Sequence, residues 1–200
     1  MARTQAADYD LRKLAIVEAA AELFAQRGFL GASLADLAEH CKSSKSLIYH
    51  YYPSKEDILF EVMASHVETL NAAVDQVEVD GGDVEDKLRR LTHALMNLYV
   101  GAANRHRVLL NDLDHLPPER RQLIVDQQRR LVDRVSGYLA RLQPKLRRSR
   151  KFARPAVMLY FGMINWTHTW FDPAGPASAD DVADLCVRVL LSGLPNAWAV

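Results

Sequence analysis

The chain has 200 residues, 49% of them hydrophobic and 25% charged, which is typical of a globular protein with a sizeable core. Lys and Arg together number 25, as do Asp and Glu, so the formal net charge is zero and bulk charge favours no nucleic-acid or membrane partner. Cys41 and Cys186 form no CxxC motif, and no signal peptide or membrane-spanning apolar run is present. We therefore expect a cytoplasmic protein without membrane contact.

The first third of the chain predicts three short elements followed by a long helix. Apolar residues at helical spacing predict helices over residues 8–27, 34–40, 44–51 and 55–77. Gly28 stands where a helix C-terminus belongs, and Pro53 cannot continue the third helix. Ser33 and Ser54 are typical N-cap residues for the second and fourth helices.

The remaining two-thirds continue in the same way after a break at Gly81-Gly82. Helical patterns cover residues 84–103, 107–115, 118–142, 154–171 and 180–191. No segment alternates like a strand for long. The sequence predicts an all-α protein of about nine helices.

The third predicted helix has two different sides. An advance of about 100° per residue places four polar side chains on one arc, which we call the polar arc: Lys45, Ser46, Tyr49 and His50. Leu47, Ile48 and Tyr51 form the apolar side. Between Glu39 and Glu56 the chain has three lysines and no acid, so this segment is locally positive. Such groups can bond phosphates and base edges, and a short helix, a turn and a second polar-faced helix predict a helix-turn-helix. The alternative is a small helical cluster whose aromatic residues only pack.

Specific residues of this region resemble the TetR family of bacterial transcriptional regulators. The resemblance lies in Phe24, Gly28, the segment SLADLA over 33–38, SKSLIYHYY over 44–52 and SKEDIL over 54–59. It implies a homodimer whose third helices enter successive major grooves of a palindromic operator in double-stranded DNA. It also implies a helix-turn-helix domain over residues 1–54 and a ligand-binding and dimerisation domain over residues 55–200.

The resemblance implies DNA contacts for Ser33, Lys45, Ser46, Tyr49, His50 and Lys55, and we add Lys42 and Ser44 as further candidates. Lys42 is a departure, because such proteins usually carry glycine at this position. Either Lys42 reaches a phosphate, or the turn is less tight. Lys55, at the start of the fourth helix, is expected to clamp a phosphate.

Two segments of the C-terminal part combine polar and apolar groups as an effector site does. From residues 105–118 and 158–171 we select seven candidate ligand-binding residues: Arg107, Asn111, His115, Tyr160, Asn165, Trp166 and Trp170. The second segment is apolar nearly all round, which predicts burial on most sides. An aromatic stripe of this kind is also typical of a core or a dimer interface. In TetR-like proteins the last two helices build the dimer bundle, which assigns dimerisation to Val187, Leu190, Leu191 and Leu194.

A narrower resemblance concerns the effector. The stretches LIYHYYPSK over 47–55 and NWTHTWFDPAGP over 165–176 are similar to TetR-type repressors of fatty-acid, steroid-ring and phenylacetate catabolism, which respond to acyl-coenzyme A thioesters. That resemblance implies a phenylacetyl-CoA or fatty acyl-CoA effector that releases the repressor from DNA. The basic run over residues 145–154 is either a solvated loop or a site for coenzyme phosphates.

Other function classes have less support. The sequence contains no GxSxG, no Gly-rich phosphate loop and no HExxH motif, so we expect neither an enzyme nor a cofactor. Asp112, Asp114 and His115 are too close on one helix for all three side chains to converge on a metal ion, so we expect no metal site. Two alternatives stay open: a TetR-type regulator of an efflux pump that senses hydrophobic small molecules, and a helical partner protein that does not bind DNA.

Overall fold

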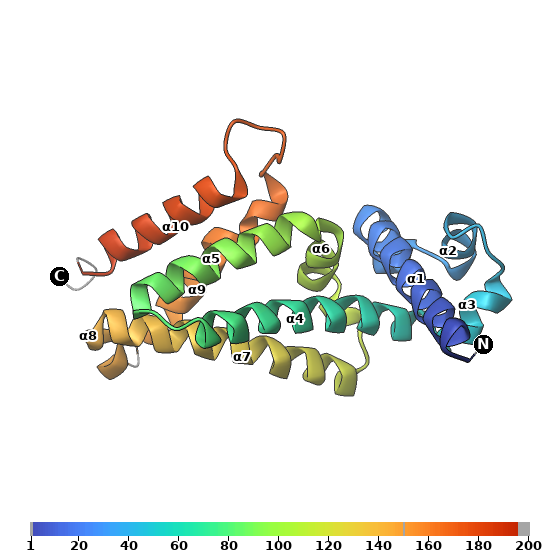
Figure 1. Ribbon diagram of the computed structural model, residues 1–200, viewed down its shortest axis with the longest axis horizontal. Helices are drawn as coiled ribbons and strands as arrows, with labels where there is room; N and C mark the ends of the chain where they lie inside the picture. The colour runs from blue at the N-terminus through green and yellow to red at the C-terminus, as the bar shows by residue number, and fades with distance from the viewer. Residues whose placement is uncertain (1, 150, 196–200) are drawn as a thin grey trace. The chain divides into compact units, whose positions relative to one another are not determined.

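The computed structural model describes residues 2–149 and 151–195, with no side chain described before Asp8, and it confirms the predicted all-α fold (Figure 1). Within these residues the chain forms ten α-helices and two 3₁₀ helices, and no strand. The elements are α1 Ala2–Gly31, α2 Leu34–His40, α3 Lys45–Tyr51, α4 Lys55–Val79, α5 Val84–Gly101, α6 Ala103–Asn111, η1 Leu113–His115, α7 Pro118–Leu142, α8 Pro144–Arg148, α9 Ala153–Asn165, η2 Trp166–Thr169 and α10 Ala179–Gly193. No helix among the described residues is both long enough and apolar enough to cross a membrane.

Two predicted helices differ from the structure, and one observed helix was not predicted. The helix expected over residues 107–115 is α6 followed by η1, and the one expected over 154–171 is α9 followed by η2. In η2 the hydroxyls of Thr167 and Thr169 donate to the carbonyls three residues earlier, at 2.5 and 2.8 Å, and such local bonds compete with α-helical geometry. Helix α8 was not predicted, because it lies inside the basic run.

Contacts divide the chain into two compact units. The first contains the chain up to Val67 together with Asn104–Val125; the second contains Glu68–Ala103 and the chain from Asp126 onward. Helices α4 and α7 therefore each contribute residues to both units. The predicted boundary between residues 54 and 55 is a division by function, and it stays a prediction.

The core of the first unit joins α1, α2, α3 and the first part of α4. Phe24, Leu37 and Ile48 are buried in it, together with Ile58 and Leu59. Helix α1 is interrupted at Gly28, whose φ of 71° and ψ of 158° lie outside helical geometry. Because of this break, the last residues of α1 turn away and bring Ser33 to the start of α2.

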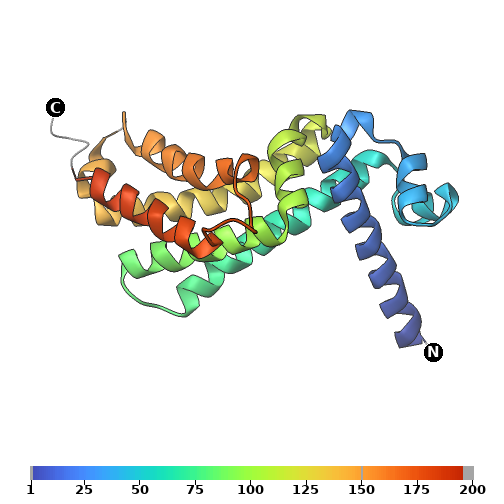
Figure 2. The same ribbon diagram turned by 90° about the horizontal axis from the view of Figure 1, so that it is seen from above.

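The core of the second unit forms around α5, which packs against α9 and α10 (Figures 1 and 2). Leu88, Leu91 and Leu95 of α5 are fully buried. One polar pair lies within this apolar core: the hydroxyls of Thr92 and Tyr160 are 3.0 Å apart, and the Thr92 hydroxyl also donates to the carbonyl of Leu88 at 2.7 Å. Burial raises the pKa of Tyr160, so this phenol stays neutral.

Candidate nucleic-acid interface and effector region

Both short helices of the helix-turn-helix are capped by serine. The backbone N–H of Asp36 donates to Ser33 Oγ at 3.1 Å, and the backbone N–H of Ser33 donates to Asp36 Oδ2 at 2.9 Å, which forms a capping box at the start of α2. At the start of α3, Leu47 N–H donates to Ser44 Oγ at 3.1 Å. The two serines thus fix where the helices begin, and their contacts with DNA stay predictions.

The turn between α2 and α3 is tight even though it lacks glycine. The N–H groups of Lys42 and Ser43 donate to the carbonyls of Glu39 and Ala38 at 2.9 and 2.8 Å. Lys42 has a φ of 50°, the left-handed conformation that glycine adopts most easily. Lys42 therefore takes the place of the glycine usual in the family, and the turn remains tight. The Lys42 side chain is exposed.

The polar arc of α3 faces solvent. Lys45, Ser46, Tyr49 and His50 are all exposed, whereas Ile48 on the opposite side is fully buried. The Lys45 ammonium lies 5.8 Å from the centre of the Tyr49 ring, so the two side chains form one cationic and aromatic surface. His50 stands edge-on to Tyr9 of α1, with the ring centres 6.4 Å apart. This arrangement leaves the donors of the arc accessible to phosphates and base edges.

The ammonium group of Lys55 bonds backbone carbonyls of its own chain, whereas the sequence predicts a contact with a DNA phosphate. The ammonium donates to the carbonyl oxygens of Phe29 and Ala32, each at 2.8 Å, and lies 4.1 Å from the centre of the Phe29 ring. These carbonyls follow the break in α1, where backbone acceptors have no helical partner. Lys55 is therefore an internal clamp on the segment before α2, and its contact with a DNA phosphate stays a prediction.

The same segment is held from α6 and η1. Phe29 N–H donates to the buried carboxylate of Asp112 at 3.1 Å, and the ring of His115 stacks on that of Phe29 with centres 5.5 Å apart. His115, predicted to touch an effector, thus packs against the end of α1. Sequence reasoning did not find Asp112 in this role, because no local pattern pairs residue 112 with residue 29.

A buried histidine pair lies nearby and was also not predicted. His66 of α4 and His106 of α6 are 1% and 2% exposed, and His66 Nε2 is 3.2 Å from His106 Nδ1. Burial and the nearby Arg105 guanidinium lower the pKa of His66 to about 4. His66 is therefore neutral near pH 7, and its ring shares a hydrogen bond with that of His106.

The seven candidate ligand residues fall into both compact units. Arg107 and Asn111 are exposed on α6 in the first unit, while Tyr160 is fully buried on α9 in the second, bonded to Thr92. Asn165 ends α9 and is half-buried. Trp166 and Trp170 are 64% and 57% exposed, so the prediction that residues 158–171 are buried on most sides is wrong for this chain taken alone. Their role as ligand contacts stays a prediction.

The predicted dimer residues lie mostly inside their own protomer. Leu190 and Leu194 are buried in the core of the second unit, Leu191 is half-buried against it, and Val187 is also fully buried. The apolar side chains exposed on this side are others: Phe152, Met158, Leu159, Leu185 and Val189. A hollow of about 330 Å³ between α8, α9 and α10 is lined almost wholly by apolar residues, and Leu190 and Leu194 are among them. We call these five residues and the hollow the outer apolar face; the dimerisation role of Val187, Leu190, Leu191 and Leu194 stays a prediction.

The basic run is part helix and part turn. Lys145, Arg147 and Arg148 belong to α8, and Arg154 lies in the first turn of α9; residue 150 is outside the described residues. Within the described ranges, 2–149 and 151–195, no group of three or more His, Cys, Asp or Glu side chains is arranged to hold a metal ion.

Two capped short helices joined by a tight turn, with an exposed cationic and aromatic arc on the second, define a helix-turn-helix DNA-binding regulator with an additional helical unit. Comparison with known proteins agrees. Residues 16–62 match the family described as bacterial regulatory proteins, tetR family, and residues 81–194 match the tetracyclin repressor-like C-terminal domain. The chain belongs to the TetR family of transcriptional regulators, as the sequence predicts. Members of this family bind operator DNA and small-molecule effectors, typically as dimers.

Individual relatives support the same family. A TetR-family regulator from Bordetella parapertussis is 35% identical, with a TM-score of 0.88 over 92% of this chain and 96% of its own. AibR, solved with isovaleryl coenzyme A and operator DNA, is 26% identical, with a TM-score of 0.79 over 90% of this chain and 98% of its own. The repressor NicS of Pseudomonas putida is 31% identical over 85 residues, which are 42% of this chain and 40% of NicS.

Proposed function

We propose that this protein is a homodimeric transcriptional repressor that binds a palindromic operator through α3 and is released by an acyl-CoA thioester. The observation that carries the DNA-binding part is the polar arc: four exposed donors on one side of a capped helix whose other side is buried. In a dimer, two such helices read half-sites about 34 Å apart, one helical turn of DNA. Lys45 suits a phosphate, and Tyr49 and His50 suit base edges or phosphates.

The outer apolar face supports the dimer. Soluble monomers rarely expose a continuous apolar patch, and such patches mark interaction sites. On this face Leu159 and Val189 are 69% and 53% exposed, beside the apolar hollow of about 330 Å³. A second copy of the same face, related by a two-fold axis, would cover these side chains and form a four-helix contact from α9 and α10.

The likeness to AibR supports the thioester effector, because that structure contains isovaleryl coenzyme A. The cations of α8 add to this support, since guanidinium groups bind phosphate in a bidentate manner. Binding needs to change operator affinity by a coupling free energy of only about 1–3 kcal/mol to alter occupancy 5- to 150-fold.

The contacts around Phe29 provide the first unit with a route for this coupling. Asp112 and His115 hold Phe29, and Lys55 holds the carbonyls of Phe29 and Ala32, immediately before the cap of α2. A displacement of η1 by an effector would therefore reach the start of α2, which packs directly against α3.

Operator binding is tested with a duplex that wild-type protein selects from a random pool. We expect Tyr49→Ala to lose most of its affinity for this duplex in a gel-shift titration. Tyr49→Phe keeps the ring and removes the hydroxyl, so it shows how much of the affinity depends on the hydroxyl alone. Leu123→Ala, at an exposed residue of α7, is the control for a surface change elsewhere. If Tyr49→Ala binds this duplex like wild type, the assignment of the polar arc is wrong.

The effector is tested by thermal stability with phenylacetyl-CoA, medium- and long-chain acyl-CoAs, free CoA and the matching free acids. A ligand at 100 times its Kd stabilises the native state by about 2.7 kcal/mol, which is readily measured. Stabilisation by one thioester and not by its acid supports the proposal and identifies the acyl group. Stabilisation by none of them refutes the thioester and leaves the DNA-binding part standing.

A further inference from the structure

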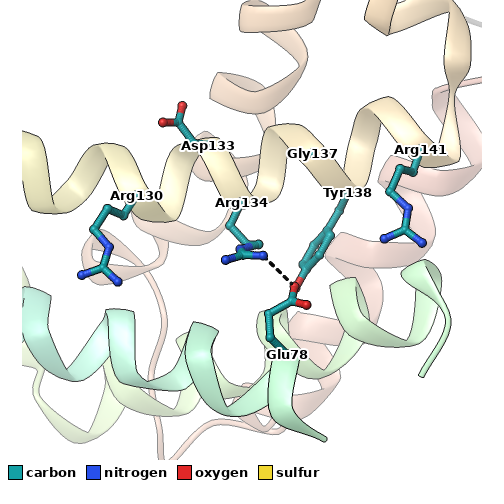
Figure 3. A pocket seen from close by; sticks show the side chains of 7 residues that line it. All are labelled: Glu78, Arg130, Asp133, Arg134, Gly137, Tyr138 and Arg141. Atoms are coloured by element: carbon teal, nitrogen blue, oxygen red, sulfur yellow. Dashed lines mark hydrogen bonds and ion pairs between the residues drawn. The ribbon is translucent and has the colours of Figure 1, made fainter. Parts of the chain in front are cut away.

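A row of arginines on α7 lines a hollow of about 480 Å³ between this helix and α4, which we call the arginine cleft. It is lined by Glu78, Arg130, Asp133, Arg134, Gly137, Tyr138 and Arg141. The residues of α7 recur at helical spacing on one side of the helix. Figure 3 shows Arg134 and Tyr138 directed toward Glu78, with Arg130 and Arg141 extending from the same side of α7 on either side of them, whereas Asp133 points away.

The carboxylate inside the cleft, that of Glu78, already has hydrogen-bonding and cationic partners. Glu78 accepts hydrogen bonds from Lys87, at 2.7 Å, and from Tyr138, and it lies 3.2 Å from Arg134. The bonds from Lys87 and Tyr138 hold the pKa of Glu78 below its usual value, so it remains ionised. Its role is to position Arg134 and Tyr138, and it leaves the other two guanidinium groups free for an added anion.

Those two arginines have spare hydrogen-bonding capacity. Among the described side chains Arg130 reaches one carboxylate, that of Asp75, at 3.9 Å with both side chains largely exposed. Arg141 forms no ion pair with any residue in the described part of the chain, and it is exposed. Guanidinium groups bind phosphate oxygens through two parallel N–H bonds.

The length of the row indicates the size of the anion. Arg130 and Arg141 are eleven residues apart, about 16 Å along the helix axis. A row of this length can hold more than one phosphate group, so the cleft suits a ligand with two separated phosphate groups. Gly137 lies between the arginines, and its missing side chain leaves open space there: a Cβ would meet no atom within 4 Å.

A second hollow adjoins the cleft and shares Gly137 and Arg141 with it. It measures about 640 Å³, and Ala140, Pro144 and Arg147 complete its lining. Its lining combines three small or apolar residues with Arg141 and Arg147, whose guanidinium planes can stack on a base or contact a further phosphate. A flat, weakly polar group joined to phosphates would fit across the two hollows.

We propose that the arginine cleft and the adjoining hollow form a binding site for a nucleoside bisphosphate. The phosphates bind Arg130, Arg134 and Arg141, and the nucleoside lies over Gly137, Ala140 and Pro144. The same chemistry occurs in a free nucleotide and at the nucleotide end of coenzyme A. The site does not depend on the proposed thioester effector, because the residues that form it recognise phosphate and not an acyl chain.

The test is calorimetric titration of the full-length protein with adenosine 3′,5′-bisphosphate, adenosine, inorganic phosphate, coenzyme A and an acyl-CoA. We expect the bisphosphate to bind more tightly than adenosine or phosphate, and more weakly as salt is added. Arg141→Gln and Arg130→Gln should each weaken it about 10- to 100-fold, the usual effect of losing a hydrogen bond to a charged group. Arg129→Gln is the matched control, because Arg129 is on the same helix, outside the cleft, paired with Asp126 at 2.7 Å.

The outcomes separate this site from the proposed effector. If the bisphosphate binds and no CoA compound does, the site stands with a free nucleotide as its ligand, and the thioester effector fails. If coenzyme A compounds bind equally well to Arg141→Gln, Arg130→Gln and wild type, the site is refuted while the thioester proposal survives. Equal weak binding of bisphosphate, phosphate and adenosine to wild type also refutes it.

Discussion

The break in α1 gives a sharp test, because Gly28 has a backbone conformation that only glycine adopts readily. With φ of 71° and ψ of 158°, it lies in a region where other residues cost about 1–3 kcal/mol. A Cβ at this position would meet no heavy atom within 4 Å, so the cost of Gly28→Ala is conformational and not steric. Replacing glycine also removes freedom from the unfolded chain, which offsets about 0.4–1 kcal/mol. The net expected destabilisation is about 1–2 kcal/mol.

The consequence should extend to DNA binding. The break directs Phe29 N–H to Asp112 and places the Phe29 and Ala32 carbonyls on Lys55. A variant that straightens α1 has to give up these bonds, and it shifts Ser33, which caps α2. We therefore expect Gly28→Ala to weaken operator binding in addition to lowering stability.

The assay is thermal unfolding at one fixed protein concentration, since self-association would make the midpoint depend on concentration. For a chain of this size each kcal/mol shifts Tm by about 2–4 °C, so Gly28→Ala should unfold about 2–8 °C below wild type. Gly31→Ala is the control: its Cβ would stand at an ordinary 3.7 Å from Arg27 Cβ, and its φ is not positive. If the two variants unfold at the same temperature, the argument from backbone conformation is wrong.

Three further predictions concern other parts of the molecule. Because the pKa of His66 is lowered from 6.5 to about 4, the free energy of unfolding should fall by up to about 3 kcal/mol as pH drops through that interval; urea unfolding of His66→Leu should lack this fall. Thr92→Val should destabilise by about 1–3 kcal/mol by leaving the Tyr160 hydroxyl without its partner, and adding Tyr160→Phe should recover part of the loss; strict additivity would contradict the pairing. Val189→Arg on the outer apolar face should give monomers in sedimentation, while Arg188→Ala should not; an unchanged dimer would exclude this face.

Prediction from the sequence works best for a helix that buries one side in a single core and exposes the other. In α3 the 100° advance separates the polar arc from Ile48, and the structure exposes the first and buries the second. Serine and proline signals place the starts of α2 and α7 at the residues observed, because capping depends on neighbours in the chain.

Long-range contacts are where sequence reasoning fails. A lysine before a long helix is compatible with a phosphate clamp, and nothing local shows that its ammonium will find the carbonyls of Phe29 and Ala32, more than twenty residues away. The arginine cleft is missed for the same reason. Arg130, Arg134 and Arg141 read as an ordinary solvated helix face until Glu78 of α4 is placed opposite them.

Helix α10 shows a different limit, because a helix with apolar residues on two sides does not indicate which side faces its own core. Val187, Leu190 and Leu194 form one apolar row, and Leu185 and Val189 form another. Helical periodicity fits both rows equally well, so the sequence alone cannot assign them to the core or to a partner. Packing of α10 on α5 and α9 makes the choice: it buries the first row and leaves the second exposed. Because exposed apolar rows favour association, the second row is the one that the dimer experiment has to disrupt.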